Sequence, residues 1–124
     1  MKLRIFANTI RWRLSRGEVA KLAHGTALQE STPLAPQSLR YSLTTSNDTN
    51  VARARFADGV LEVMLPLSAV HDWAESDEVG LTQQISSEAG VLRLLVEKDL
   101  ECLHGEAEGQ EDCYPNPMAA TARR

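Results

Sequence analysis

The side chains best suited to metal or acid–base chemistry gather near the C-terminal end of the sequence, in LVEKDLECLHGEAEGQEDCYPNP. Cys102 and His104 are one residue apart, and thiolate and imidazole groups are good ligands for zinc or copper. Asp112 is a candidate third ligand from the acidic stretch that follows. Cys102, His104 and Asp112 therefore define a hypothetical site for zinc or another transition metal, with further donors available in Glu101, Glu111 and Cys113.

Two other interpretations of this segment stay open. Cys102 has the chemistry of a nucleophile with His104 as its base, although no strand-to-helix elbow and no glycine run for an oxyanion hole accompany it. Alternatively, Cys102 is a small buried side chain and His104 is a surface residue near the end of a sheet. The structural interpretation is preferred, because short motifs of this kind often occur without a site.

Arginines at alternate positions form a second candidate site, for an anion. Arg11 and Arg13 alternate with apolar residues in IRWRL, and Arg53 and Arg55 alternate with Ala and Phe in VARARFA. In a strand, each pair lies on one face, where guanidinium groups bind phosphate or polyphosphate through paired hydrogen bonds. The competing interpretation, which is preferred, is a solvated outer face with cross-strand ion pairs, for which the acids Glu62 and Glu97 are available.

A third cluster, HDWAESDE, places His71 and Glu75 one helical turn apart. That spacing suits two metal ligands, but two ligands do not make a site. We therefore interpret the cluster as a short helix whose Trp73 packs on a sheet while its acids face water.

The first unit that must position these groups is strand, strand, helix. Alternating apolar residues predict strands over 2–6 and 10–14. Ser15 and Glu18 have the spacing of a capping box, so a helix should follow and end near Gly25.

Further strands are predicted over 26–31, over a three-stranded meander with a tight turn at Asp58-Gly59, and on either side of the turn SSEAG. Ser68 is predicted to cap a second short helix. No internal repeat of solenoid length is evident. The sequence therefore predicts an α+β domain over 1–104 built on an antiparallel sheet, strongly curved or partly closed into a barrel, and a flexible polar tail over 105–124.

Charge is distributed unevenly along the 124 residues, which carry a formal net charge of −4. Residues 1–25 contain six basic side chains and one acid, whereas residues 97–117 contain seven acids and one basic side chain. The two ends are expected to fold face to face. Residues 1–14 lack the continuous apolar stretch of a secretory signal, and no apolar run suits a membrane span, so a cytoplasmic protein is expected.

The two ends also carry a resemblance. MKLRIFANTIRWRLSRGEV and VLRLLVEKDLECLHG…EDCYPNP resemble a family of small uncharacterised bacterial cytosolic proteins, a domain of unknown function. The shared patterns are KLRI, N-S/T-IR and RL at the start, and LVEKD, CLH, ED and PNP at the end. Leu100 stands where the family pattern has an aromatic residue, and Cys113 falls outside the pattern. The resemblance therefore argues against a Cys102–Cys113 disulfide, and it implies no established activity.

Together, these features favour a non-enzymatic binding or accessory domain without a cofactor, acting on a protein or a small anionic ligand. A metal-binding protein or metal-dependent enzyme that uses Cys102 and His104 is the alternative, and binding of phosphate or another polyanion by the arginine pairs is a further one. RNA is not favoured, because aromatic residues are scarce at 5% and the net charge is negative. An exposed edge strand would allow a homodimer.

Overall fold

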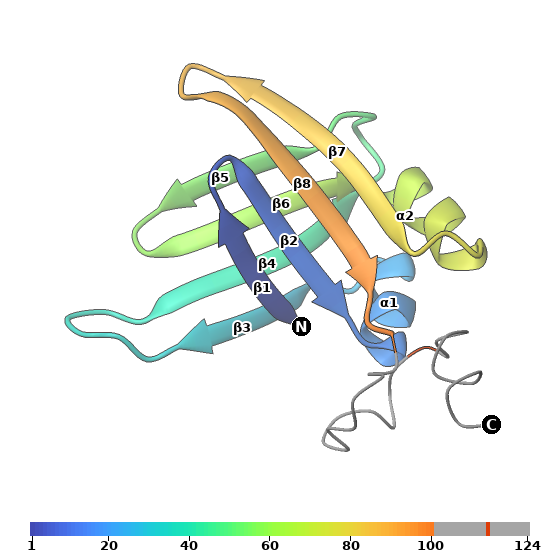
Figure 1. Ribbon diagram of the computed structural model, residues 1–124, viewed down its shortest axis with the longest axis horizontal. Coiled ribbons are helices and arrows are strands. Elements are labelled where there is room, and N and C mark those ends of the chain that lie inside the picture. Colours follow the sequence, from blue (N-terminus) through green and yellow to red (C-terminus); the bar gives the residue numbers. More distant parts are fainter. Residues whose placement is uncertain (101–113, 115–124) are drawn as a thin grey trace.

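A computed structural model describes residues 1–100 and residue 114. This part of the chain forms eight strands and two helices (Figure 1). The prediction of an α+β fold with two short helices is confirmed. The strands are β1 (Lys2–Phe6), β2 (Thr9–Leu14), β3 (Leu28–Thr32), β4 (Leu39–Ser46), β5 (Arg53–Ala57), β6 (Val60–Pro66), β7 (Gly80–Ser87) and β8 (Gly90–Lys98), and the helices are α1 (Arg16–Ala23) and α2 (Leu67–Glu75).

The strands form two separate four-stranded sheets. Sheet A has the order β1-β2-β8-β7 and sheet B has the order β3-β4-β6-β5. The antiparallel prediction holds for the four hairpins, but the central pairs β2–β8 and β4–β6 run parallel. Both sheets are therefore mixed, and among the described strands neither sheet closes into the predicted barrel.

The predicted three-stranded meander is right only in its second half. β5 and β6 form a tight hairpin, and Asp58 and Gly59 both have positive φ (54° and 76°), as the favoured two-residue hairpin turn requires. β4, however, pairs with β6 and not with β5, so β5 becomes an edge strand. Alternation identifies a strand and a tight turn identifies a hairpin, but neither shows which hairpins lie side by side.

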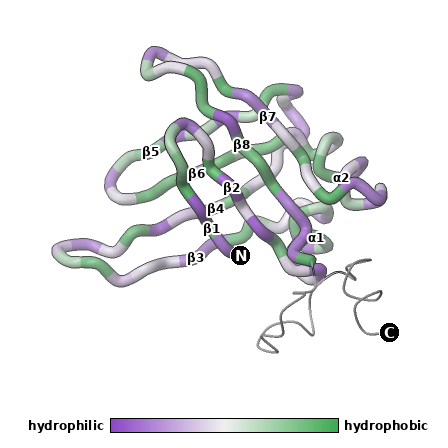
Figure 2. The backbone as a smooth tube through the Cα atoms, viewed as in Figure 1, coloured by the Kyte–Doolittle hydropathy of each residue, from purple (hydrophilic) through white to green (hydrophobic). Residues whose placement is uncertain are grey.

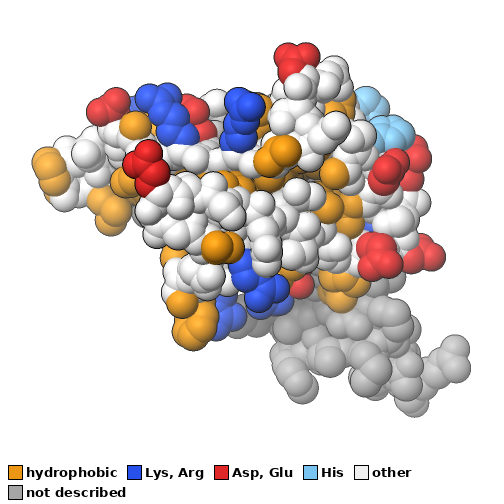
Figure 3. All heavy atoms as spheres, turned by 90° about the horizontal axis from the view of Figure 1, so that it is seen from above, with side chains coloured by type: hydrophobic (Ala, Val, Ile, Leu, Met, Phe, Trp, Pro, Cys, Tyr) orange, Lys and Arg blue, Asp and Glu red, His pale blue; other side chains and the backbone are white. Residues whose placement is uncertain are grey.

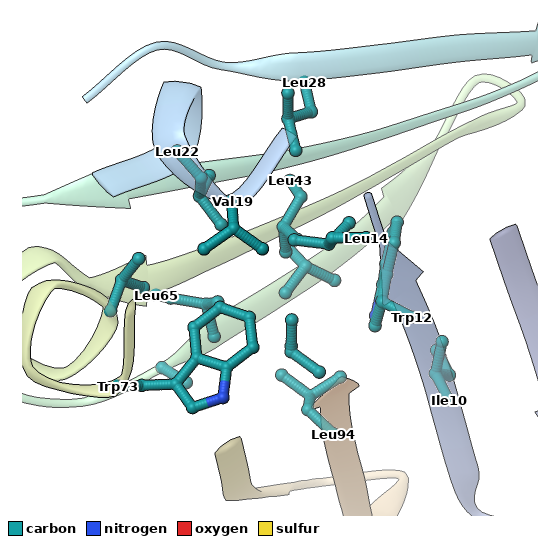
Figure 4. Packing of buried hydrophobic residues seen from close by; sticks show 14 of the residues in the cluster. Ile10, Trp12, Leu14, Val19, Leu22, Leu28, Leu43, Leu65, Trp73 and Leu94 are labelled. Atoms are coloured by element: carbon teal, nitrogen blue, oxygen red, sulfur yellow. The ribbon is translucent and has the colours of Figure 1, made fainter. Parts of the chain in front are cut away.

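One apolar core lies between the two sheets. Most of its side chains come from the inner faces of the central strands and from both helices, which lie next to each other at one end of the sheets (Figures 1 and 4). Leu14 of β2, Leu43 of β4 and Val19 of α1 converge there. The alternation of apolar and polar residues is visible along the strands in Figure 2. Polar residues are thereby left on the outer face of each sheet.

The two halves of the chain repeat the same topology, a hairpin, a helix and a second hairpin. Reading sheet A as β1-β2-β8-β7 and sheet B as β5-β6-β4-β3 places equivalent elements in the same order. Equivalent backbone hydrogen bonds also recur, from Arg93 N–H to the Asn8 carbonyl (2.8 Å) and from Arg40 N–H to the Gly59 carbonyl (2.9 Å). The fold is therefore an internal pseudo-two-fold repeat. The first half buries Ile10, Trp12, Leu14, Val19 and Leu22, and the second half buries Leu61, Val63, Leu65, Val70 and Trp73 at the same spacings.

The two helices begin differently. The predicted capping box of α1 is confirmed: the Ser15 hydroxyl accepts a hydrogen bond from Glu18 N–H (3.3 Å), and the Glu18 carboxylate accepts one from Ser15 N–H (2.9 Å). The predicted Ser68 cap is wrong. Helix α2 follows directly from β6 with Pro66 at the N-cap, so Ser68 already lies inside the first turn.

Replacing these two serines should separate a capping residue from a merely helical one. Ser15→Ala should lower the free energy of unfolding by about 1 kcal/mol, because an amide at the start of α1 loses its acceptor. Ser68→Ala should change it by no more than about 0.5 kcal/mol. Urea unfolding of both variants measures the difference, and an equal loss in the two would contradict this assignment of the caps.

Candidate functional site

The predicted metal ligands Cys102, His104 and Asp112 lie outside the described residues, as do Glu101, Glu111 and Cys113. Among residues 1–100 and 114, no group of three or more His, Cys, Asp or Glu side chains is arranged to hold a metal ion. His71 and Glu75 form only an exposed pair on α2, with 3.5 Å between the imidazole Nε2 and the carboxylate. Trp73 packs in the core, as predicted.

The structure does describe the contact at which the segment 101–113 begins and ends. Leu100 and Tyr114 form a bridge, and Tyr114 N–H donates to the Asp99 carbonyl (2.8 Å). The Arg16 guanidinium lies 5.3 Å from the centre of the Tyr114 ring. The two ends of the segment are therefore held together against α1 and the end of β8.

Lys98 joins this contact to the core. It is 7% exposed, and its Nζ donates to the Ser76 carbonyl (2.6 Å) and lies 5.5 Å from the ring centres of both Trp73 and Tyr114. Burial lowers the pKa of Lys98 below its ordinary value. The negative charges of Asp77 and Glu78 act in the other direction and raise this pKa, but by less. Because the ammonium is held by a carbonyl and two aromatic faces, the side chain serves a structural role.

Sheet A carries a block of four cations on its outer face. The β1–β2 register places Lys2 directly opposite Arg13, and Arg4 directly opposite Arg11. These four positions alternate with the apolar residues on the opposite face of the strands, of which Ile10, Trp12 and Leu14 are buried. We call Lys2, Arg4, Arg11 and Arg13 the cationic block.

Two acids from the end of β8 and just beyond it contact the block. Glu97 binds Arg11, and the Asp99 carboxylate lies 3.1 Å from Lys2 Nζ. The hydrogen bond that Arg11 Nε–H donates to the Glu97 carboxylate is the main reason that the pKa of Arg11 is raised. The predicted meeting of the basic and acidic ends is therefore confirmed for the described part of the chain, and so is the predicted role of Glu97 as a partner.

Half of the block forms no ion pair with another described residue. Arg4 and Arg13 form no ion pair with any residue between 1 and 100 or with Tyr114. A groove of about 180 Å³ is lined by Leu3 and the four cations. A second groove of about 380 Å³ shares Arg4 and Arg11 with the first, and its other lining residues are Phe6, Thr9 and Leu95.

The other predicted pair, Arg53 and Arg55, lies on the outer face of sheet B. Because the core separates the sheets, the four predicted arginines do not form one site. Figure 3 shows Lys and Arg side chains gathered on opposite sides of the molecule. Grooves of about 470 and 430 Å³ cross the outer face of sheet B, and both are lined by Gln29, Ser42 and Glu62. Glu62 forms none of the ion pairs seen among the described residues, contrary to the prediction.

Lys2 and Phe6 were not predicted as site residues, although the sequence contains a signal for both. In KLRIF, Leu3 and Ile5 are the apolar alternating set, so Lys2, Arg4 and Phe6 must share the opposite face. An aromatic residue on the charged face of a strand is the signal.

Shortening Lys98 tests its structural role. Lys98→Ala should lower the free energy of unfolding by about 2 kcal/mol, because the Ser76 carbonyl loses a charged donor and the aliphatic stem is lost. Lys98→Met should recover about half, since it keeps the stem. Because the folded pKa is lowered, the folded state releases this proton first, and wild-type stability should rise relative to Lys98→Met as pH increases toward 10.5. Urea unfolding between pH 8 and 10.5 checks both expectations. If the free energy of unfolding of the wild-type protein fell relative to that of Lys98→Met as pH increased, the burial of the charge would be contradicted.

Comparison with known proteins agrees with the resemblance carried by the two ends of the sequence. Neither helix in the described part of the chain is long and apolar enough to cross a membrane. No curated protein and no solved structure matches the sequence. The sequence model of the family described as "Family of unknown function (DUF7009)" matches residues 1–118, and the chain therefore belongs to that family.

Proposed function

We propose that this protein is a non-enzymatic binding protein that holds a phosphate-bearing anion on the outer face of sheet A. The observation that carries the proposal is the pairing of like charges in the cationic block, Lys2 opposite Arg13 and Arg4 opposite Arg11. Like charges directly opposite each other destabilise an antiparallel pair. Two such pairs side by side lower the stability of sheet A, and a bound anion would offset their repulsion.

The charge balance supports the same conclusion. Arg93 also lies on this outer face, opposite Thr9, so five cations share it. The only acids that form ion pairs with the cationic block among the described residues are Glu97 and Asp99. The face therefore keeps an excess of positive charge in a protein whose net charge is negative. Such a local excess attracts a small anion without favouring long polyanions.

The side-chain chemistry favours phosphate. Guanidinium groups present paired donors that match two phosphate oxygens, and Arg4 and Arg13 form no ion pair with any acid in the described part of the chain. The smaller groove is lined by cations and Leu3, a set that binds an anion and includes no general base. Sheet B is less suitable, because Glu62 lies opposite Arg55 and lines both of its grooves.

Sodium tripolyphosphate is the probe that tests this proposal. It should raise the melting temperature of the wild-type protein and bind in calorimetry, at an ionic strength held constant with sodium chloride. The double variant Arg4→Gln/Arg13→Gln should bind at least tenfold more weakly, since two charge-assisted contacts are lost.

The other two predicted arginines supply the matched control. Arg53→Gln/Arg55→Gln removes the same charge from the outer face of sheet B and should leave binding within about twofold, because screening weakens charges on the far side of the core. An equal loss in both double variants would indicate nonspecific attraction, and the absence of binding to the wild-type protein would refute the proposal.

A metal site at the segment 101–113 is the second candidate function. The observation that favours it is the contact between Leu100 and Tyr114. Cys102 is two residues from Leu100 along the chain, and Asp112 is two residues from Tyr114. His104 is two residues further from Leu100, so a contact that joins the segment's ends would bring the three predicted ligands within reach of one ion.

Elemental analysis of protein purified without chelator tests this second candidate. The wild-type protein should carry near-stoichiometric zinc or another transition metal, and His104→Ala should lose it. His71→Ala is the matched control, because that imidazole lies on α2 and should leave metal content unchanged. Metal at background level in all three proteins would contradict the metal site and favour structural roles for Cys102 and His104.

A further inference from the structure

Phe6 is 76% exposed, and it lies beside the cationic block on the outer face of sheet A. We propose that the ligand of this face is a free nucleotide of the nucleoside triphosphate class. Its base stacks on Phe6 and its phosphates contact the cationic block. This inference rests on the proposed anion-binding function and adds the part of the ligand that is not phosphate.

The spacing along β1 fits such a ligand. Lys2, Arg4 and Phe6 occupy alternate positions, so successive side chains on this face are about 6.7 Å apart. The row from Phe6 to Lys2 is therefore about 13 Å long, a length suited to an extended nucleotide with its base at one end. Arg11 and Arg13 run alongside on β2 and supply the second row of cations.

The two grooves join at the position that this pose requires. The larger groove contains Phe6 and Thr9, the smaller contains Lys2 and Arg13, and both are lined by Arg4 and Arg11. An aromatic ring accepts the flat face of a base, and Leu95 of β8 adds an apolar side chain to the lining of the same groove. Thr9, opposite Phe6, brings a hydroxyl to the place where the sugar would lie.

Comparison of equivalent positions in the two halves of the chain shows which side chains on the outer face of sheet A are not required by the fold. Ala57 occupies the position of Phe6 in the second half of the chain, since each ends the first strand of its hairpin. An aromatic side chain at this position is therefore not required by the fold. Arg53 and Arg55 keep the charges of Lys2 and Arg4, but Arg11 and Arg13 correspond to Glu62 and Met64. Only sheet A combines both rows of cations with an aromatic ring.

A free nucleotide is favoured over a strand of nucleic acid. Phe6 is the only aromatic residue on the outer face of sheet A among the described strands, so one base can stack there. Binding of a strand relies on several stacked bases and an extended basic surface. The net charge of −4 opposes such a surface.

Calorimetry with ATP and tripolyphosphate in EDTA, at constant ionic strength, tests the inference. ATP should bind the wild-type protein about tenfold more tightly, although it carries less negative charge, because stacking adds to phosphate binding. Phe6→Ala should bring ATP down to the affinity of tripolyphosphate and leave tripolyphosphate unchanged. Phe6→Trp should keep the preference for ATP.

Phe56 provides the matched control. It is 67% exposed, but it lies on β5 at the edge of sheet B, so Phe56→Ala should change neither affinity. Equal affinities for ATP and tripolyphosphate would overturn the nucleotide as the ligand, and a preference for ATP that survives Phe6→Ala would overturn the stacking of the base on Phe6; both outcomes would leave anion binding intact. Tighter binding of a ten-residue oligothymidylate than of ATP would overturn it in favour of nucleic acid. Binding of neither probe would refute the proposed function itself.

Discussion

The parallel contacts between β2 and β8 and between β4 and β6 are the constraint on which the rest of the structure depends. A single hairpin is at best marginally stable in water, and every strand outside these contacts belongs to a hairpin. Pairing β2 with β8 joins residues 9–14 to residues 93–98 and so brings the two ends of the domain together. The shared core can form only when both contacts exist, since its side chains come from the central strands of both sheets.

The same contact explains how sheet A tolerates its like-charged pairs. Because β8 lies next to β2, Glu97 reaches Arg11, and Asp99 just beyond the strand reaches Lys2. These two ion pairs neutralise half of the cationic block, and Arg4 and Arg13 form no ion pair among the described residues. The apolar face of β2 is buried, so the core holds Arg11 and Arg13 in place; on β1, Leu3 packs against the same core while Ile5 is 62% exposed. A site fixed in this way on strands is more rigid than one built on loops.

Features that depend on neighbouring residues could be predicted from the sequence, and features that depend on distant ones could not. Ser15 and Glu18 form the expected capping box because the bonding partners are three residues apart. Asp58-Gly59 forms the expected turn for the same reason. The prediction that Ser68 caps α2 was wrong because the N-cap is Pro66, two residues earlier. The residues of β4 and β6 contain no local sequence signal for their parallel pairing, so a meander was expected instead.

The candidate site follows the same division. Alternation correctly placed Arg11 and Arg13 together, but it could not show that Arg53 and Arg55 belong to another sheet. Phe6 was visible in KLRIF as an aromatic residue out of phase with Leu3 and Ile5. Its meaning emerges only once β2 supplies the neighbouring cations.

The internal repeat gives each position of one half a counterpart in the other, and the comparison distinguishes two kinds of constraint. Leu14 and Leu65, or Val19 and Val70, are identical because each pair serves the shared core from equivalent places. The outer faces do not contribute to the core, and equivalent positions there differ. Arg11 in the first half corresponds to Glu62 in the second, and Phe6 corresponds to Ala57. A charge reversal at an exposed position leaves the fold unchanged but inverts the ligand that a face attracts. The two sheets therefore share one folding solution while offering different chemistry, and the difference is concentrated where β1 and β2 carry the cationic block.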